Sequence, residues 1–327
     1  MKIFKKSLIA VTVFIAVLLN FQVSQAGENL WVYTKGTDTR PKGSFEFKIG
    51  DIARLGKDSG DYSFHDIRPE LEYGVTDKLT VGGSIMIFGH NYSVSKTDLD
   101  PMYTTQQTQS VTDGGTQKRF NKTQYGGYEL SAKYNVLSPY KDFMGLSFKL
   151  AYEQKDKYRL DGSDIEQKSY VGVIMLQKDW FDDKLIYAFN WKTELERRKG
   201  DEVLEEEIAF DISMGLSYRF KPKHYIGIEF RRQEDHLSPF NTTTNTFEDG
   251  VYPSSWDWGD FKLGTRHQYG QYLGPTYHYA EKDWWLTSGI LFQTNGGCSN
   301  VNPSCTNGRN RDEHETVHVS LQMGYEF

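Results

Sequence analysis

The end of the chain alternates between apolar and polar residues. The apolar positions are Val317, Val319, Leu321, Met323, Tyr325 and Phe327, and the polar positions between them are His318, Ser320, Gln322, Gly324 and Glu326. Successive side chains of a β-strand point to opposite faces, so one face of this segment is apolar throughout. Outer-membrane β-barrels use such strands, because one face meets lipid and the other meets a polar lumen. The pattern predicts a transmembrane strand that ends the chain.

Similar segments recur after residue 40. Their ranges are 44–50, 67–73, 79–87, 128–134, 146–152, 169–179, 185–191, 208–220, 226–230, 269–279, 286–292 and 317–327. Segment 169–179 is apolar on both faces, which leaves its register open. Pro69 and Pro275 fall inside two segments, although proline removes a ladder hydrogen bond. We predict an all-β protein, a closed antiparallel transmembrane β-barrel of about twelve strands over residues 44–327.

The connections between these segments alternate in length. Short turns fall near Gly74, Ser138, Trp180, Lys221 and Glu281, and the long polar connections are 89–124, 156–168, 235–266 and 294–313. Outer-membrane barrels have short periplasmic turns and long extracellular loops, so both termini are expected in the periplasm. The many aromatic residues of 235–266 suggest a lid or constriction at the barrel mouth.

The beginning of the chain has the pattern of a secretory signal peptide. Three lysines precede an apolar run from Leu8 to Leu19, and Ser24-Gln25-Ala26 follows as a cleavage site. The run is shorter than the roughly 20 residues that a membrane-spanning helix needs. We therefore expect a signal peptide over 1–26, a periplasmic N-terminal segment over 27–43, and a barrel in the outer membrane of a Gram-negative bacterium.

The composition agrees with this class. Hydrophobic residues make up 38% of the chain and aromatic residues 15%. A barrel needs an apolar residue at only every second strand position, and aromatic side chains mark its lipid interfaces. The formal net charge of -6 gives no basic stripe, so we expect no nucleic-acid partner.

The polar faces of the segments predict the lining of the lumen. The predicted lumen-lining residues are Glu46, Lys48, Arg68, Glu70, Glu72, Glu129, Lys133, Lys149, Glu153, Lys192, Asp211, Arg219, Glu229, Arg231, Tyr272, His278, Trp285 and His318. Such charges can line a narrow wet channel, or they can pair across the lumen and close it, because pairing relieves the cost of burying isolated charges. Tyr272 and Trp285, with Met86, Phe88 and Leu291, give the lumen some apolar surface, which suits a small organic solute. The alternative is that these side chains only fill space.

Catalytic and metal-binding signatures are weak. His314-Glu315-Thr316-Val317-His318 matches the H-E-x-x-H zinc pattern, but that pattern works on a helix. Here it leads into a strand, where residues four apart are about 13 Å distant, so we predict no metal site and no cofactor. His65, His90, His236 and His267 are further candidates for chemistry, and solvated side chains are the ordinary interpretation. We predict no enzyme, with a surface enzyme as the third alternative.

Cys298 and Cys305 both fall in the last long connection. In an exported protein they are expected to form a disulfide. The expected partners are outer-membrane lipid and lipopolysaccharide, together with the barrel-assembly machinery, which would recognise the C-terminal strand ending in Phe327. A small organic solute is a further expected partner.

Several turns and strand ends carry a family resemblance. They are Asp38-Thr39-Arg40-Pro41-Lys42-Gly43, Glu72-Tyr73-Gly74-Val75-Thr76-Asp77, Leu137-Ser138-Pro139-Tyr140-Lys141-Asp142, and Leu273-Gly274-Pro275 through Trp284-Trp285. The chain resembles a family of functionally uncharacterised Gram-negative outer-membrane proteins. That family is similar to the transporter-like proteins of meta-pathway phenol degradation. The resemblance implies a barrel and a transport role, principally as a passive channel, with a non-conducting structural or interaction barrel as the alternative. It transfers no catalytic or binding residue.

Overall fold

The computed structural model describes residues 29–58, 60–94, 119–199, 203–241, 246–247, 263, 265–298, 308–311 and 313–327. The strands are β1 (Phe45–Lys57), β2 (Gly60–Thr76), β3 (Leu79–Val94), β4 (Phe120–Leu137), β5 (Gly145–Lys157), β6 (Asp164–Trp180), β7 (Leu185–Lys199), β8 (Val203–Lys221), β9 (His224–Asn241), β10 (Thr246–Phe247), β11 (Thr265–Ala280), β12 (Trp284–Cys298) and β13 (Val317–Glu326). The described residues contain no helix that is long and apolar enough to cross a membrane.

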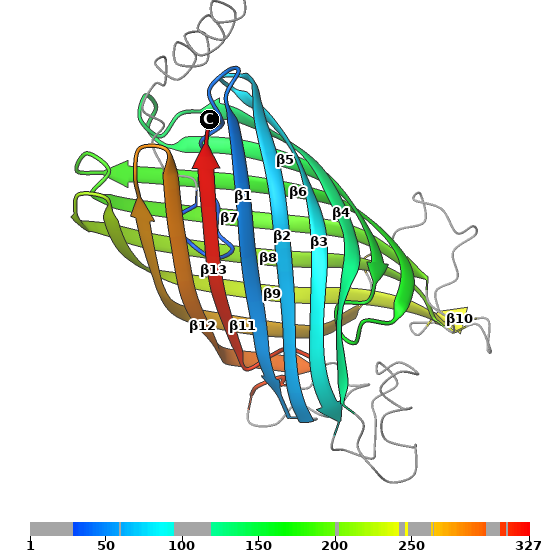
Figure 1. The fold of residues 1–327 in the computed structure, drawn as a ribbon. Helices are drawn as coiled ribbons and strands as arrows, with labels where there is room; N and C mark the ends of the chain where they lie inside the picture. The colour runs from blue at the N-terminus through cyan, green and yellow to red at the C-terminus, as the bar shows by residue number, and fades with distance from the viewer. Residues whose placement is uncertain are drawn as a thin grey trace, which may run out of the picture.

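The strands form one closed antiparallel barrel (Figure 1). β1 pairs with β2 on one side and with β13 on the other, and β9 joins β8 to β11. The short β10 pairs only with β9, so twelve of the 13 strands make up the wall. At the closure, the backbone N–H of Phe45 donates to the carbonyl oxygen of Phe327 at 2.7 Å, and the reciprocal bond is 2.9 Å. The predicted fold class is confirmed.

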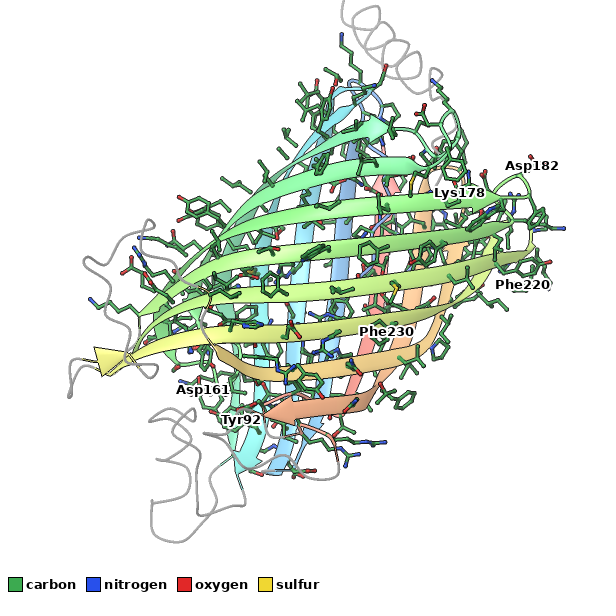
Figure 2. All side chains as sticks on the ribbon, turned by 180° about the vertical axis from the view of Figure 1, so that it is seen from behind. Tyr92, Asp161, Lys178, Asp182, Phe220 and Phe230 are labelled. Atoms are coloured by element: carbon green, nitrogen blue, oxygen red, sulfur yellow. The ribbon has the colours of Figure 1, made fainter. Side chains whose placement is uncertain are left out.

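The short turns and both ends of the barrel sequence share one rim, which we call the short-turn rim. It lies at the upper left in Figure 1, and Lys178, Asp182 and Phe220 mark it in Figure 2. Tyr92 and Asp161 lie at the opposite end, which we call the long-loop end. Which rim faces the periplasm stays a prediction.

The strands are longer than the alternating segments. β9 extends to Asn241, although its apolar pattern ends at Phe230, and β8 begins at Val203 rather than at residue 208. The two extensions continue the same ladder, for example from Phe210↔Glu234 to Glu206↔Ser238. The sequence misses these extensions because side chains beyond the apolar band are polar on both faces while the backbone pairing continues.

The two faces of the wall differ as the alternation requires. Outward-facing Leu130, Leu150 and Leu321 are 57%, 69% and 57% exposed, whereas inward-facing Ser147 and Gln177 are fully buried. β6, whose register the sequence left open, turns Val171 and Met175 inward.

Pro69 and Pro275 both lie at interruptions of a ladder. β2 and β3 pair at Ile67↔Ile87 and again at Glu70↔Ser84, with no paired residue between them on either strand. β11 and β12 likewise skip from Leu273↔Phe292 to Thr276↔Gly289. A proline, which has no N–H to donate, is accommodated at such positions.

Some predictions fall outside the described residues. These are the signal peptide over 1–26, the disulfide, because Cys305 and the side chain of Cys298 are not described, and most of the aromatic connection 235–266. They stay predictions.

Candidate functional site

The N-terminal segment, residues 29–43, lies inside the barrel. We expected residues 27–43 to precede the barrel in the periplasm, and the described part does precede β1. Most of its side chains are nevertheless buried or half-buried, with Leu30, Trp31, Val32 and Thr34 at most 2% exposed. The segment crosses the lumen near the short-turn rim, and appears as the dark blue coil behind the front strands in Figure 1.

Glu229 of β9 holds this segment by its backbone. Its carboxylate accepts hydrogen bonds from the N–H groups of Val32 (2.8 Å), Tyr33 (2.8 Å) and Thr34 (2.6 Å), and from the Thr34 hydroxyl (2.8 Å). The Glu229 side chain is fully buried. A buried carboxylate needs such partners, because its hydration is lost, and hydrogen bonds to a charged acceptor are stronger than neutral ones.

Two lumen-facing glycines make room for the segment. The indole ring of Trp31 covers Gly215 of β8 so closely that a Cβ there would lie 2.3 Å from Trp31 Cε2. Val32 covers Gly289 of β12, where a Cβ would lie 2.5 Å from Val32 Cγ2. The glycines therefore form recesses that match the shape of the segment.

Other strands bind the rest of the segment through side chains. Asn190 of β7 accepts from the Lys35 N–H at 2.6 Å and donates to the Lys35 carbonyl at 2.8 Å. Lys133 of β4 donates to the Gly36 carbonyl at 2.9 Å, and Gln177 of β6 accepts from the Thr37 N–H at 2.8 Å. None of these is a strand-to-strand ladder bond, so the pairing of the barrel strands does not depend on them.

The connection between β5 and β6 folds inward at the long-loop end. Tyr62 donates to the carbonyl of Leu160 at 2.9 Å, and Tyr92 donates to that of Asp161 at 3.1 Å. These rings belong to an aromatic cluster on β2 and β3, whose buried members are Tyr62, Phe64, Met86, Phe88 and Tyr92. Burial raises the pKa of the Asp161 carboxyl, although hydrogen bonds from Ser163 oppose this.

A second inward segment precedes β13. Tyr272 donates to the carbonyl of Glu315 at 2.9 Å, and Gln293 donates to that of Asn310 at 2.6 Å. Burial raises the pKa of Glu315, but Lys57 Nζ at 3.7 Å and the His318 imidazole outweigh it and hold that pKa well below the ordinary range. The N-terminal segment therefore narrows the lumen near the short-turn rim, and the β5–β6 connection and the segment before β13 narrow it at the long-loop end.

Between these segments the wall carries an ion-pair network. Its nitrogen–oxygen pairs are Lys48 with Glu70 (3.2 Å) and Glu72 (2.6 Å), Arg68 with Asp66 (2.9 Å), Glu129 (3.5 Å) and Glu153 (3.7 Å), Lys149 with Glu129 (2.6 Å), Lys155 with Glu153 (2.8 Å) and Glu194 (3.3 Å), Lys192 with Glu194 (2.8 Å), and Arg231 with Asp211 (2.6 Å). The network runs from β1 to β9. Both signs recur, so the surface can contact either end of a dipolar solute.

A cavity of about 290 Å³ lies against this network. Most of its charged lining comes from the network, with Lys35, Arg54 and Arg159 in addition, and its apolar lining includes Ile52, Val171, Met175 and Trp285. A smaller cavity of about 110 Å³ lies beyond it toward the long-loop end, where Arg159, His314 and Glu315 contribute to the lining. Arg54, Lys155 and Arg231 line both cavities, so the two are adjacent.

The predicted lumen-lining residues fall into three groups. Lys48, Arg68, Glu70, Glu129, Lys149, Glu153, Lys192, Asp211, Arg231 and Trp285 line the larger cavity. Glu229, Lys133 and His318 bind the N-terminal segment, His318 through the Tyr33 hydroxyl at 2.8 Å. Glu46, Glu72, Tyr272 and His278 are buried among other side chains, and Arg219 donates to the Asp182 carbonyl at the short-turn rim.

Other lining residues were not in the predicted set. Arg54 and Asp66 continue the inward alternation of β1 and β2, and following the period past residue 50 would have found Arg54. Arg159 lies in a connection, where periodicity gives no signal. Met86, Phe88 and Leu291 face inward as expected, but they pack in hydrophobic clusters and do not line either cavity.

The two histidines of the H-E-x-x-H pattern lie in different surroundings. His314 belongs to the inward segment, and His318 lies in β13. The ring nitrogens of His318 are 2.8 Å from the Tyr33 hydroxyl and 3.3 Å from Glu315 Oε2. His318 therefore contributes to fixing the N-terminal segment.

The chain belongs to a family of unknown function (DUF6662), whose model matches residues 23–327. A comparison with curated proteins gives no match. Among solved structures, the COG4313 outer membrane channel from Pseudomonas putida F1 is similar, with a TM-score of 0.56, 11% identity, and coverage of 91% of this chain and 100% of that chain. The KdgM porin in complex with disordered oligogalacturonate matches with a TM-score of 0.42 and 9% identity, covering 87% of this chain and 99% of that one.

The likeness to the Pseudomonas channel concerns the fold, which is that of an outer-membrane β-barrel. Membership of an uncharacterised barrel family agrees with the resemblance found in the sequence. The similarity to proteins of phenol degradation stays a prediction.

Proposed function

We propose that the protein is a passive outer-membrane channel for a small organic solute, and that the N-terminal segment forms its main constriction. The observation that carries the proposal is the larger cavity, which joins apolar wall to charges of both signs. Sites of this mixed character favour small organic molecules held by a few polar groups. The fold shared with an outer-membrane channel supports a transport role.

The solute class follows from the cavity lining. Trp285 offers an aromatic face, while Arg231, Lys192 and Arg68 offer cationic groups to a carboxylate. A small aromatic acid matches both. Its charge would compete with the carboxylates that already pair with these cations, so binding is expected to be weak and exchange fast, as transport requires.

A non-conducting barrel with an ion-paired lumen is the second candidate. The same ion-pair network favours it, because each cation of the network already has a carboxylate within 4 Å. Pairing relieves the cost of burying each charge, so the same pairs are as compatible with a closed interior as with a solute path. The two candidates differ in one measurable property, ionic current.

Planar-bilayer conductance of the refolded protein tests the proposal. We expect a small steady current that benzoate blocks saturably. Trp285→Leu is expected to weaken the block severalfold, because it removes the ring in the cavity. The matched control is Trp284→Leu, since Trp284 is the next residue on β12 and is 40% exposed on the outer face. Silence of a folded protein would favour the ion-paired barrel, and equal block in both variants would contradict the assigned solute path.

A further inference from the structure

The outer wall carries a histidine–carboxylate pair that the lumen does not use. His65 Nδ1 of β2 is 2.7 Å from Asp51 Oδ2 of β1. Both side chains point outward and are 41% and 37% exposed. The second carboxylate oxygen, Asp51 Oδ1, is buried and has no hydrogen-bond partner within the described part of the chain.

A serine lies near this pair on the same outward face of β2. Ser63 is two residues before His65 on β2 and therefore shares its outward face. In the β1–β2 register, Asp51 is opposite Ile67 and His65 is opposite Ala53. Asp51 thus approaches the imidazole from the short-turn side, and Ser63 is the next outward residue on the long-loop side. A bond from His65 Nδ1 to Asp51 leaves Nε2, the other ring nitrogen, for a second partner, and Ser63 is the next outward residue of β2 whose hydroxyl could reach it.

We propose that Ser63, His65 and Asp51 form a catalytic triad for the hydrolysis of carboxylic esters of membrane lipids. A serine, an imidazole and an orienting carboxylate in this order are the groups that acyl hydrolysis requires, whatever the fold. This activity is separate from the channel in the lumen.

The position of the triad along the barrel axis matches the depth at which lipid esters lie in a membrane. On β2 the outward residues toward the short-turn rim are Ile67, Pro69, Leu71 and Tyr73, all apolar, and His65 is the first polar position beyond them. On β3 the outward residues change in the same way from Ile87 to Asn91. The triad therefore lies at the boundary between hydrocarbon and head groups, where the acyl esters of lipids are located.

The neighbours of the triad divide into an apolar and a polar flank. Toward β13 the outward residues remain apolar, with Val319 paired to Ala53 and Leu321 paired to Asp51. Toward β3, Gly89 is opposite His65 and leaves that side of the imidazole without a covering side chain. An acyl chain can lie along the apolar flank while its ester reaches Ser63.

The polar flank supplies groups for the negative charge of the reaction. Asn91 of β3 is opposite Ser63 in the β2–β3 register. Arg119 Nε donates to Asn91 Oδ1, and Arg119 Nη1 is 3.6 Å from Asp61 Oδ2. This bond orients the Asn91 amide and does not consume its Nδ2 donor. Amide and guanidinium groups are known stabilisers of the oxyanion of acyl transfer.

The chemical steps balance without any further reactant except water. Ser63 Oγ attacks the ester carbonyl carbon and its proton passes to His65 Nε2, while Asp51 stabilises the imidazolium through Nδ1. The bond from the carbonyl carbon to the alcohol oxygen breaks, and the leaving alcohol takes the proton from His65. Water then attacks the acyl-serine, its proton passes to His65 and on to Ser63 Oγ, and the fatty acid leaves.

Labelling and hydrolysis by the full refolded protein test the proposal. In detergent micelles, a long-chain alkyl fluorophosphonate is expected to modify Ser63, as identified by peptide mass spectrometry. Release of fatty acid is measured in two arms, one with didecanoyl phosphatidylcholine and one with lipopolysaccharide, which distinguishes the two lipid sources. Ser63→Ala and His65→Gln should each lower the release by about 10³-fold or more.

Asp51 acts through His65 and is a positioning residue. Asp51→Asn is expected to lower kcat by about 10²–10⁴-fold with KM for the lipid unchanged, because the imidazole loses its tautomer and orientation. A merely structural role would not give this split.

Ser288→Ala is the matched control. Ser288 is an outward-facing serine of β12, opposite Leu321, and has no histidine two residues away. The Ser288→Ala variant should release fatty acid at the same rate as the unmodified protein. A protein that folds, as judged by its heat-modifiable migration, but neither reacts with the probe nor releases fatty acid overturns the proposal. Equal activity in Ser63→Ala overturns it as well, and neither result bears on ionic current.

Discussion

Replacement of Gly215 by alanine is expected to displace Trp31 from β8 and to raise the ionic conductance of the barrel. The added Cβ would lie 2.3 Å from Trp31 Cε2 and 2.4 Å from Nε1, well inside contact distance. Trp31 is fully buried, so any shift of its ring disturbs the side chains packed around it. Overpacking of this kind costs about 1–3 kcal/mol. That cost corresponds to a change of about 5–150-fold in the equilibrium between the bound and released N-terminal segment.

The measurement is single-channel current in planar bilayers, with Gly172→Ala as the control. Gly172 lies on β6, and a Cβ there would meet no atom within 4 Å. The control should conduct like the unmodified protein, and both variants should remain folded barrels because the ladder is untouched. An unchanged current in folded Gly215→Ala would mean that the N-terminal segment does not limit conduction.

Replacement of Glu229 by glutamine is expected to release the N-terminal segment more completely. The carboxylate accepts three backbone N–H groups and one hydroxyl. Glutamine has nearly the same size as glutamate. One carboxylate oxygen is replaced by an NH2 group, however, and this donor would face the N–H and hydroxyl donors of the segment. Hydrogen bonds to a charged group contribute about 1.5–3 kcal/mol each, and buried donors left without a partner add their own cost. We expect the bound state of the segment to lose at least about 3 kcal/mol.

Limited trypsin digestion of the refolded protein reports this release. Lys35 is half-buried and its backbone is bound by Asn190, so cleavage after Lys35 should be slow in the unmodified protein and at least tenfold faster in Glu229→Gln. Glu70→Gln is the matched control. It removes a lumen carboxylate that pairs with Lys48 at 3.2 Å and makes no hydrogen bond to the segment among those described. Equal cleavage rates in both variants would show that Glu229 does not hold the segment.

The N-terminal segment is bound mainly by side chains of the wall, and this affects how the lumen can open. Most of its backbone hydrogen bonds go to side chains, among them those of Glu229, Asn190 and Gln177, and the barrel ladder stays complete without these. Release therefore costs a limited number of side-chain contacts and not the cooperative ladder of the wall. A constriction of this kind can move while the barrel remains intact.

The proposed triad shows what periodicity alone could and could not find. The alternation of β2 places Ser63 and His65 on one outward face, which the sequence contains. The alternation does not predict that Asp51 lies beside His65, because the pairing of Asp51 with Ile67 depends on the register between β1 and β2. The partner of His65 follows only from the alignment of β1 with β2.

The sequence by itself determined the wall of this protein. Every second residue of segments such as 208–220 and 317–327 must meet hydrocarbon, and this requirement fixes the identity of these strands and which residues face outward from local pattern alone. The pattern left the register of β6 open, because this strand turns apolar Val171 and Met175 into the lumen, and it missed the polar strand extensions beyond the lipid.

The tertiary structure alone decided what fills the barrel. The positions of residues 29–43, of the inward connection near Asp161 and of the segment around Glu315 depend on hydrogen bonds between residues far apart in the chain. The bonds from Glu229 to Val32, Tyr33 and Thr34 span more than 190 positions. Such contacts leave no periodic trace, because a segment without regular structure is held by the shape and charge of its surroundings rather than by a repeat of its own.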